Sequence, residues 1–270
     1  MKNWLDNKTV IITGASSGIG KELTKLFISK NNCKVIGVAR NEQKMKQFVE
    51  ELGNMAANFS YELFDVSDEA KWKEFAGKVD SVDLLVNNAG IFYKFDNFLN
   101  IDEKQGEQIM NVNFYSVVYG CRNFLPKLSQ KGGIVNICSS DALLSVAGTN
   151  YYAASKGAVK CFSQSLAYEF PKKYIACMFP GFTKTELFRD IDFTAKETRL
   201  LNLFMSTSEK IAKKIYRAIR KRKKYKVVGY DARIFNMFSK LNSNGGAKLI
   251  NGVLKKTKLD MFSTITNENL

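Results

Sequence analysis

Short runs of apolar, mostly β-branched residues recur along this 270-residue chain and alternate with amphipathic stretches. Nearly continuous apolar runs indicate strands that are buried on both faces, as in a parallel sheet covered by helices on each side. The pattern therefore predicts an α/β fold of repeated strand–helix–strand units. The seven predicted strands are TVIIT (9–13), CKVIGVA (33–39), YELFDV (61–66), VDLLVNN (82–88), GIVNIC (133–138), IACMF (175–179) and YKVVGY (225–230).

Helical periodicity fills the intervals between these strands. It predicts helices at about 18–30, 41–52, 68–78, 103–130, 151–171 and 208–223. The three prolines, Pro126, Pro171 and Pro180, each stand where a helix or strand is expected to stop. No repeat, low-complexity tract or linker interrupts the alternation, and the length suits one large domain. We therefore expect a single domain over 1–270.

The part of the chain after the last predicted strand, 231–270, is expected to form a helical extension. It contains an amphipathic stretch (ARIFNMFSKLN), a glycine-rich break (NSNGGA) and a second helical piece (KLINGVLKKTKLD). We expect it to pack across the sheet edge or against a partner subunit. The alternative is a basic amphipathic helix that lies on a membrane surface.

The composition excludes some kinds of chemistry. The chain has no histidine, so Ser–His hydrolysis is excluded and a metal site is not expected. The five cysteines are scattered in apolar surroundings without a CxxC pair, which favours reduced thiols. The start, MKNWLDNKTVIITG, leads almost directly into a strand without a signal-peptide core, and no apolar window is long enough to span a bilayer. We expect a cytoplasmic protein.

Positive charge is concentrated late in the chain, whose net charge is +15. The segment 210–226, KIAKKIYRAIRKRKKYK, holds ten Lys and Arg residues and no acid. A solvated helix face is the favoured interpretation, and weak contact with an anionic surface is the alternative. No nucleic-acid-binding motif accompanies the segment, so we do not expect a nucleic-acid partner.

A glycine-rich turn, TGASSGIG (13–20), follows the first predicted strand and opens a helix. Gly14 permits a tight turn, Gly18 lets the backbone approach a ligand, and Gly20 allows close helix packing. The helix start offers unpaired N–H groups to a phosphate. This turn is interpreted as a pyrophosphate site, although a structural strand–helix turn can have a similar sequence.

The sequence YYAASK (151–156) places two tyrosines before a lysine. Residues four apart lie on the same face of a helix, so Tyr152 faces Lys156 and Tyr151 does not. An ammonium group beside a phenol favours the phenolate, so we expect Lys156 to lower the pKa of Tyr152. The pair is a candidate general acid.

These motifs, together with NNAG (87–90), Asn113 in NVNF, Ser139 in VNICSS and PGFTKTE (180–186), occur in an order that resembles the short-chain dehydrogenase/reductase family. The resemblance covers about 1–190. It implies a Rossmann-type, doubly wound parallel sheet of about seven strands in the order 3-2-1-4-5-6-7. It also implies an NAD(P)-dependent oxidoreductase.

The resemblance assigns the catalytic roles. Tyr152 would donate a proton to a carbonyl oxygen, Ser139 would hydrogen-bond the same oxygen, and Lys156 would also bind the nicotinamide ribose. Ser139 is preferred to Ser140 because it follows the strand directly and stands thirteen residues before Tyr152. Asn113 would hold a proton-relay water, and a buried structural asparagine is the alternative.

The end of the second predicted strand bears on the choice of cofactor. Sites that select NAD place a carboxylate there, whereas an arginine accommodates the 2′-phosphate of NADP. Here Ala39 and Arg40 occupy the position, so NADP(H) is favoured over NAD(H). By resemblance Asp65 would meet the adenine. The full predicted cofactor set is Gly14, Ser16, Ser17, Gly18, Ile19, Gly20, Arg40, Asp65, Val66, Asn87, Ala89, Gly90, Tyr152, Lys156, Pro180, Gly181, Thr183 and Thr185.

The substrate pocket of the family is built from variable loops, here 91–98, 141–150 and a substrate loop at about 186–206. They are rich in Phe, Leu and Met, which favours a hydrophobic ketone, aldehyde or acyl group, unless these residues only pack the loops. The sequence thus predicts NADPH-dependent reduction of a carbonyl compound, or the reverse reaction on the alcohol. A non-catalytic NADP-binding sensor or scaffold is the alternative. The family often pairs helices such as 103–130 and 151–171 between subunits, so a homo-oligomer is also expected.

Overall fold

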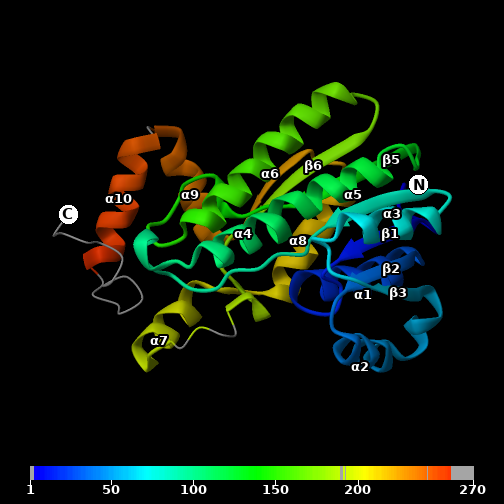
Figure 1. Ribbon diagram of the computed structural model, residues 1–270, viewed down its shortest axis with the longest axis horizontal. Coiled ribbons are helices and arrows are strands. Elements are labelled where there is room, and N and C mark those ends of the chain that lie inside the picture. The colour runs from blue at the N-terminus through cyan, green and yellow to red at the C-terminus, as the bar shows by residue number, and fades with distance from the viewer. Residues whose placement is uncertain (1–2, 189–190, 192, 242, 257–270) are drawn as a thin grey trace.

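Seven parallel strands form the central sheet of the computed structural model, which describes residues 3–188, 191, 193–241 and 243–256 (Figure 1). Their order is β3-β2-β1-β4-β5-β6-β9, which confirms the predicted Rossmann-type topology. The strands are β1 (Thr9–Thr13), β2 (Lys34–Ala39), β3 (Phe59–Leu63), β4 (Val82–Asn87), β5 (Leu128–Ile137), β6 (Tyr174–Pro180) and β9 (Tyr225–Val228).

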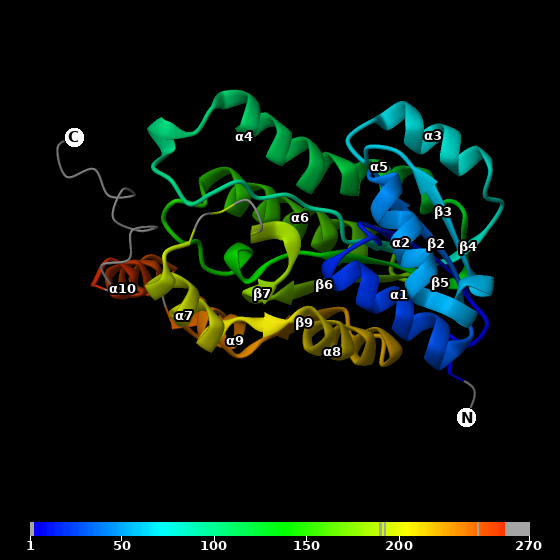
Figure 2. The same cartoon turned by 90° about the horizontal axis from the view of Figure 1, so that it is seen from below.

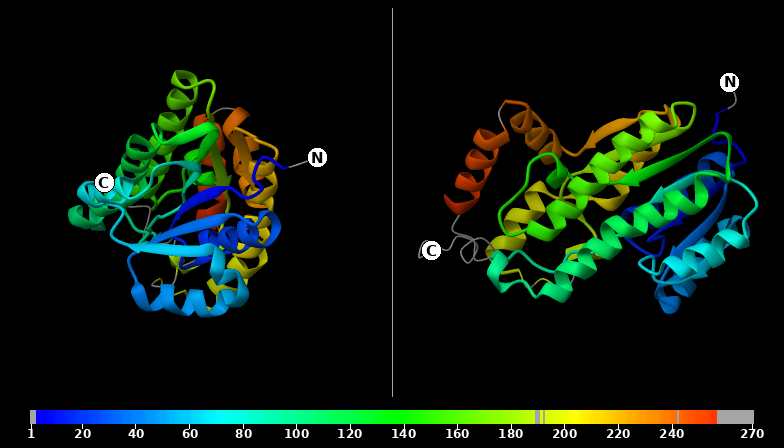
Figure 3. Two further views of the ribbon diagram at one scale, coloured as in Figure 1. Left: turned by 90° about the vertical axis from the view of Figure 1, so that its right-hand side faces the viewer. Right: turned by 45° about the horizontal axis from the view of Figure 1, so that its top comes forward.

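Helices cover both faces of this sheet (Figures 2 and 3). Alternation along β1 directs Val10 and Ile12 to the core on one face of this sheet and Ile11 to the core on the other. Burial on both faces explains why the strand sequences are almost continuously apolar. The helices are α1 (Gly18–Asn31), α2 (Glu42–Leu52), α3 (Glu69–Gly77), α4 (Glu103–Met110), α5 (Ser116–Phe124), α6 (Asn150–Glu169) and α8 (Ser208–Arg220).

One predicted helix is shorter than expected. The segment 103–130 forms α4, a π-helical turn at Asn111–Tyr115 and α5, which ends at Phe124. Pro126, which lacks an N–H donor, follows this end. Strand β5 then begins at Leu128 and pairs with Val82 before a register shift. This strand thus starts before residue 133, where the sequence predicted it, and the other predicted strands and helices of the repeat start and end within about three residues of the observed bounds.

The expected substrate loop, 186–206, contains structure that periodicity did not predict. Strands β7 (Thr183–Lys184) and β8 (Ser206–Thr207) pair in a small parallel sheet. The 3₁₀ turn Glu186–Phe188 and helix α7 (Ala195–Phe204) lie between them. Three further 3₁₀ turns are Gly53–Asn58, Phe98–Asn100 and Ser140–Ala142. The two-residue strands carry too little pattern to be found from sequence.

The C-terminal extension forms two helices, α9 (Tyr230–Leu241) and α10 (Ser243–Lys256), at the end of the molecule away from β2 and β3 (Figure 1). The expected glycine-rich break is wrong, because residues 243–247 begin α10. A Cβ on Gly246 would lie 2.6 Å from the Phe238 carbonyl oxygen, so glycine lets α10 approach α9 closely. The end of the expected extension, 257–270, lies outside the described residues.

The basic segment 210–226 is mostly the outer face of α8. Ile211, Ile215 and Ile219 are fully buried in the core shared with α1, while Lys213 and Arg217 are exposed. This arrangement agrees with the solvated-face interpretation. Contact with an anionic surface stays a prediction. Among the described residues, no helix combines the length and apolar character needed to cross a bilayer.

Candidate active site

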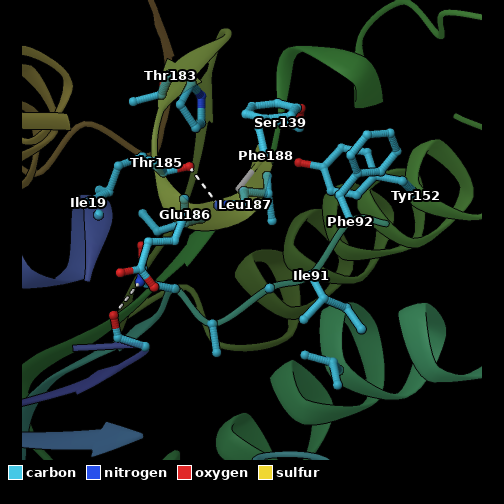
Figure 4. Close-up of a pocket in the computed structure, with 18 of the residues that line it drawn as sticks. Ile19, Ile91, Phe92, Ser139, Tyr152, Thr183, Thr185, Glu186, Leu187 and Phe188 are labelled. Carbon is cyan, nitrogen blue, oxygen red and sulfur yellow. Dashed lines mark hydrogen bonds between the residues drawn. The ribbon is translucent and has the colours of Figure 1, made fainter. Parts of the chain in front are cut away.

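A cavity of about 500 Å³ opens at the carboxyl ends of the central strands, where doubly wound sheets bind their ligands (Figure 4). Most of the predicted site residues line this one cavity. They are Gly14, Ser16, Ser17, Gly18, Ile19, Arg40, Val66, Ala89, Gly90, Ser139, Tyr152, Lys156, Pro180, Gly181, Thr183 and Thr185. The structure places Gly20, Asp65, Asn87 and Asn113 outside the cavity wall.

The glycine-rich turn has the backbone geometry that its sequence predicts. Gly14 and Gly18 have φ values of +65° and +53°, in the region that favours glycine. A Cβ on Gly20 would lie 2.3 Å from the Gly14 carbonyl oxygen, so Gly20 permits the close packing expected of it. A Cβ on Gly18 would instead point at Thr185, 3.1 Å from its methyl group. Gly18 therefore leaves space between the turn and the β7 segment.

Helix α1 starts at this turn without a side-chain cap. Ser17 makes no capping hydrogen bond and the first turn contains no acidic residue. By contrast, Asn41, Asp68 and Asp102 cap α2, α3 and α4 through their side chains. The first N–H groups of α1 are thus available to an anion in the cavity. These features fit the pyrophosphate of a dinucleotide.

An asparagine that sequence reasoning missed fixes this turn against β4. Asn88 lines the cavity, and its Nδ2 donates to the carbonyl oxygens of Thr13 (2.9 Å) and Gly14 (3.3 Å). Thr13 Oγ1 accepts the backbone N–H groups of Asn88 and Ala89. The predicted neighbour Asn87 points into the core instead and donates to Asn136 Oδ1 at 2.8 Å. Successive strand residues face opposite sides, so only one of the pair reaches the cavity.

Tyr152 and Ser139 both line the cavity, and the Ser139 hydroxyl acts on the Tyr152 phenol. Figure 4 shows both residues at the cavity. Burial raises the pKa of the Tyr152 phenol above its usual value, and the bond from Ser139 opposes this only in part. The expected lowering by Lys156 is not observed. The Lys156 Nζ lies 5.9 Å from the centroid of the Tyr152 ring, too far for its charge to outweigh desolvation.

Lys156 is almost fully buried, and burial lowers the pKa of its ammonium group. Its Nζ donates to the Ile137 carbonyl oxygen at 3.2 Å. A Cβ on Gly90 would lie 3.3 Å from both the Lys156 Nζ and the Asn113 Oδ1. Glycine at position 90 therefore keeps a space into which these two polar groups point.

Asn113 lies in the π-helical turn between α4 and α5 and is fully buried. Its Oδ1 accepts the Ile91 N–H (2.8 Å), and its Nδ2 donates to the Ile91 carbonyl oxygen (3.0 Å) and Ser155 Oγ (3.1 Å). These bonds hold the cavity segment at Ile91. Such π-bulges are common at functional sites.

The structure separates the paired candidates Tyr151 and Tyr152. The Tyr151 ring packs against Gly106 and stacks on Phe98, with 6.1 Å between ring centroids, away from the cavity. Ser140 begins the 3₁₀ turn Ser140–Ala142, whereas Ser139 caps it by accepting the Asp141 N–H at 3.1 Å. The cavity placement agrees with the preference for Tyr152, whereas Ser139 and Ser140 both line the cavity, so the preference for Ser139 stays a prediction.

Arg40 lines the cavity at the end of β2, and its Nη1 pairs with Asp65 Oδ2 at 3.0 Å. Burial by itself would raise the pKa of the Asp65 carboxyl, but hydrogen bonds donated by Ser67 and Arg40 hold this pKa below its usual value. Lys44, which sequence reasoning missed, also lines this end of the cavity and pairs with Glu186. Two cations therefore lie near the position where NAD-selective sites carry an acid.

Asp141, a cavity residue that the sequence did not single out, has an unusual environment. It is 7% exposed, and burial raises the pKa of its carboxyl to about 7. Its Oδ1 accepts the Val146 N–H at 2.9 Å, and the carboxyl also contacts the Thr149 hydroxyl. Because Thr149 Oγ1 donates to the Val146 carbonyl oxygen, a protonated Asp141 can donate to Thr149. Burial thus outweighs the hydrogen bonds from Val146 and Thr149, which by themselves lower the pKa of this carboxyl.

We expect this carboxyl to make stability depend on pH. The folded chain keeps a proton that the unfolded chain releases near pH 3.8, so stability from this group is lost as pH rises toward 7. The loss is roughly 1.4 kcal/mol per pH unit in that window. Asp141→Asn, which stays neutral, should flatten the curve. Urea unfolding of parent and variant from pH 4 to 8 measures the difference, and parallel curves would contradict the assignment.

The fold, the uncapped helix after β1 and the Ser139, Tyr152 and Lys156 side chains define a Rossmann-type dinucleotide-dependent oxidoreductase. Comparison with known proteins agrees. Residues 8–196 match the family model described as short chain dehydrogenase, and the chain belongs to that family.

Two curated relatives are each 33% identical to this chain. One is the 3-oxoacyl-(acyl-carrier-protein) reductase of Chlamydia pneumoniae, aligned over 192 residues that cover 68% of this chain and 76% of the relative. The other is the benzil reductase ((S)-benzoin forming) of Saccharomyces cerevisiae, aligned over 198 residues that cover 68% and 74%.

Solved structures are similar over most of the chain. A short-chain dehydrogenase from Streptomyces avermitilis superposes with a TM-score of 0.75 at 25% identity, covering 94% of this chain and 98% of that one. A serine dehydrogenase complexed with NADP⁺ gives a TM-score of 0.71 at 26% identity, covering 78% and 88%. The chain is therefore an NAD(P)-dependent oxidoreductase by family.

Proposed function

We propose that this chain reduces a carbonyl group beside an apolar substituent, with NADPH as the hydride donor. The observation that carries the proposal is the convergence of Ser139, Tyr152 and Lys156 on the cavity that holds the glycine-rich turn. The two relatives named above are both carbonyl reductases by name. Their names support this direction of reaction.

The residues of this chain have distinct roles in the proposed reaction. When bound, the nicotinamide dinucleotide supplies the hydride. Tyr152 donates a proton to the carbonyl oxygen, and Ser139 donates a hydrogen bond to the same oxygen. A phenol whose pKa is raised by burial stays protonated at neutral pH, which suits a proton donor. Lys156 offers three N–H donors near Gly90 for binding the cofactor ribose.

Preference for NADPH is supported by the charges at the end of β2. Arg40 has five N–H donors and pairs with Asp65 through Nη1, so other donors are left for a 2′-phosphate. Lys44 lines the same end of the cavity, and Ala39 brings no carboxylate to repel a phosphate.

Replacing Arg40 by alanine should weaken NADPH binding by ~10-fold or more, the usual loss of a charge-assisted hydrogen bond. NADH binding should change by less than about twofold, because NADH has no 2′-phosphate. Fluorescence titration of both cofactors measures the ratio. Lys46→Ala, on the outer face of α2 and away from the cavity wall, is the charge-matched control. Equal losses for both cofactors in Arg40→Ala would refute the preference.

A non-catalytic NADP-binding sensor remains the rival function, and the complete set of Ser139, Tyr152 and Lys156 in one cavity favours the enzyme. A panel of carbonyl compounds followed by NADPH absorbance tests the proposal. It should include benzil, 2,3-butanedione, aldehydes and 3-oxoacyl thioesters. NADPH binding without turnover on any member of the panel would favour the sensor.

Small carbonyl compounds or alcohols are the proposed partners, and no role for nucleic acid is proposed. Assembly as a homo-oligomer is supported by exposed aromatic side chains on the predicted pairing helices, Tyr115 before α5 and Tyr168 on α6. The cytoplasm is the proposed location, supported by the free thiol state of all five cysteines.

A further inference from the structure

The C-terminal helices α9 and α10 lie beyond residues 8–196, the part of the chain that matches the family model, yet α9 contributes a residue to the wall of the reaction cavity. Phe235 of α9 lines the cavity and is buried. Phe235 belongs to a separate apolar cluster with Leu144 and Val146 of the 141–149 loop. Phe182, which follows β6, and Ile250, on α10, pack against this cluster. The extension thus forms part of the cavity wall and is packed on its loops.

Phe235 is connected to the catalytic tyrosine through a continuous series of aromatic contacts. It packs edge-on against Phe182, with 6.4 Å between centroids, and Phe182 contacts Phe188 at 6.2 Å. Phe188 contacts Phe92 at 5.9 Å, and Phe92 packs edge-on against Tyr152 at 5.2 Å. All five rings line the cavity. One wall of the reaction space is therefore aromatic from α9 to the proton donor, and Figure 4 shows Phe188, Phe92 and Tyr152 of this wall.

Two polar side chains of the extension, Asn251 and Asp231, hydrogen-bond to loops that line the cavity. Asn251 of α10 accepts the Ala147 N–H through Oδ1 at 2.7 Å, and its Nδ2 donates to the Ser145 carbonyl oxygen at 3.4 Å. Asp231 at the start of α9 accepts the Phe182 N–H at 2.5 Å. Asn251 therefore holds the loop that follows Ser139, and Asp231 holds the loop that follows β6.

We infer that the α9–α10 extension selects the substrate. Phe235 is a specificity-determining residue for an aryl group beside the reacting carbonyl, and Asn251 is a positioning residue that holds the 141–149 loop in its binding shape. This inference rests on the proposed carbonyl reduction. Aromatic rings gain from edge-to-face contact beyond simple burial, so the wall favours an aryl over an alkyl substituent.

Two α-diketones isolate the contribution of the aryl group. Benzil carries phenyl groups where 2,3-butanedione carries methyl groups, and the reacting carbonyls are otherwise alike. The parent protein loaded with NADP⁺ should bind benzil. With NADPH, the parent should reduce benzil with a kcat/KM at least ~10-fold above that for 2,3-butanedione. Calorimetry measures binding without requiring turnover, and NADPH absorbance measures reduction.

Phe235→Ala should raise the Kd and KM for benzil by ~10-fold and leave those for 2,3-butanedione within about twofold, because only the phenyl group loses its contact. Phe235→Leu, which keeps the apolar volume, should at least halve the preference for benzil over 2,3-butanedione. It replaces the alanine variant as the test if that variant does not fold. Met237→Ala, an exposed change on the same helix, should match the parent.

Asn251→Ala should raise the KM for both diketones about fivefold with kcat and the NADPH Kd within twofold, because a looser loop weakens substrate binding alone. Hydrogen exchange in peptides covering 141–149 should become faster in this variant. Val253→Ala, exposed on the same helix, is its control. A merely structural role would lower kcat, KM and cofactor binding together, and that result would contradict positioning.

The outcomes separate this inference from the function on which it rests. A parent that binds benzil but reduces no compound of the carbonyl panel would refute carbonyl reduction, while the effect of Phe235 on benzil binding would still support the extension as the selector. A parent that reduces other ketones but neither binds nor prefers benzil would overturn the inference and leave the reductase intact. Folded Phe235→Ala or Phe235→Leu with the diketone preference of the parent would also overturn it.

Discussion

Tyr152→Phe is expected to cut turnover by ~10²-fold or more while NADPH affinity stays close to that of the parent, because the change removes only the hydroxyl that donates the proton. The ring would still pack edge-on against Phe92, so the cavity wall is preserved. Stopped-flow absorbance at saturating NADPH measures turnover on the best ketone from the panel, and fluorescence titration measures affinity.

The neighbouring tyrosine provides a matched control for this change. Tyr151→Phe removes the same atom from the adjacent residue, whose ring packs on Phe98 and Gly106 outside the cavity, and should lower turnover less than about threefold. Wild-type turnover in Tyr152→Phe, on a substrate that the parent reduces, would show that the proton comes from another group.

The frame of the fold was predictable because its signals are local and repeated. Buried strands such as TVIIT need apolar side chains on both faces, and Gly14 and Gly18 adopt backbone angles that favour glycine. Spacing also placed Tyr152, and not Tyr151, beside Lys156 in the cavity, since a four-residue step on one helix fixes which side chains share a face. These features depend on few partners outside their own segment.

Other features depend on residues that are distant in sequence. The raised pKa of the Asp141 carboxyl follows from its burial, which outweighs the hydrogen bonds from Thr149 and Val146. The raised pKa of the Tyr152 phenol follows from its desolvation, which the sequence spacing to Lys156 does not reveal. The role of Phe235 appears only once α9 packs on the cavity loops. The two-residue strands β7 and β8 have no periodicity to detect.

Gly18→Val should reduce dinucleotide affinity by ~10²-fold or more. The φ of Gly18 is +53°, and its Cβ would lie 3.1 Å from the Thr185 methyl group, so the branched side chain would fill the space between the turn and β7. Pyrophosphate could then not reach the N–H groups at the start of α1. Fluorescence titration with NADPH measures the loss, and a circular dichroism melt reports whether the variant is folded.

The matched control for this change is Gly53→Val, which separates backbone strain from obstruction. Gly53 has nearly the same φ, +52°, but its Cβ would have no neighbour within 4 Å, and the residue does not line the cavity. Both variants put a valine at a positive φ, which favours glycine, so both should lose stability, and the circular dichroism melt measures how much each loses. Only Gly18→Val should lose NADPH binding. Equal affinities in the two folded variants would mean that the turn does not hold the pyrophosphate, because strain would then be the only effect that either valine exerts.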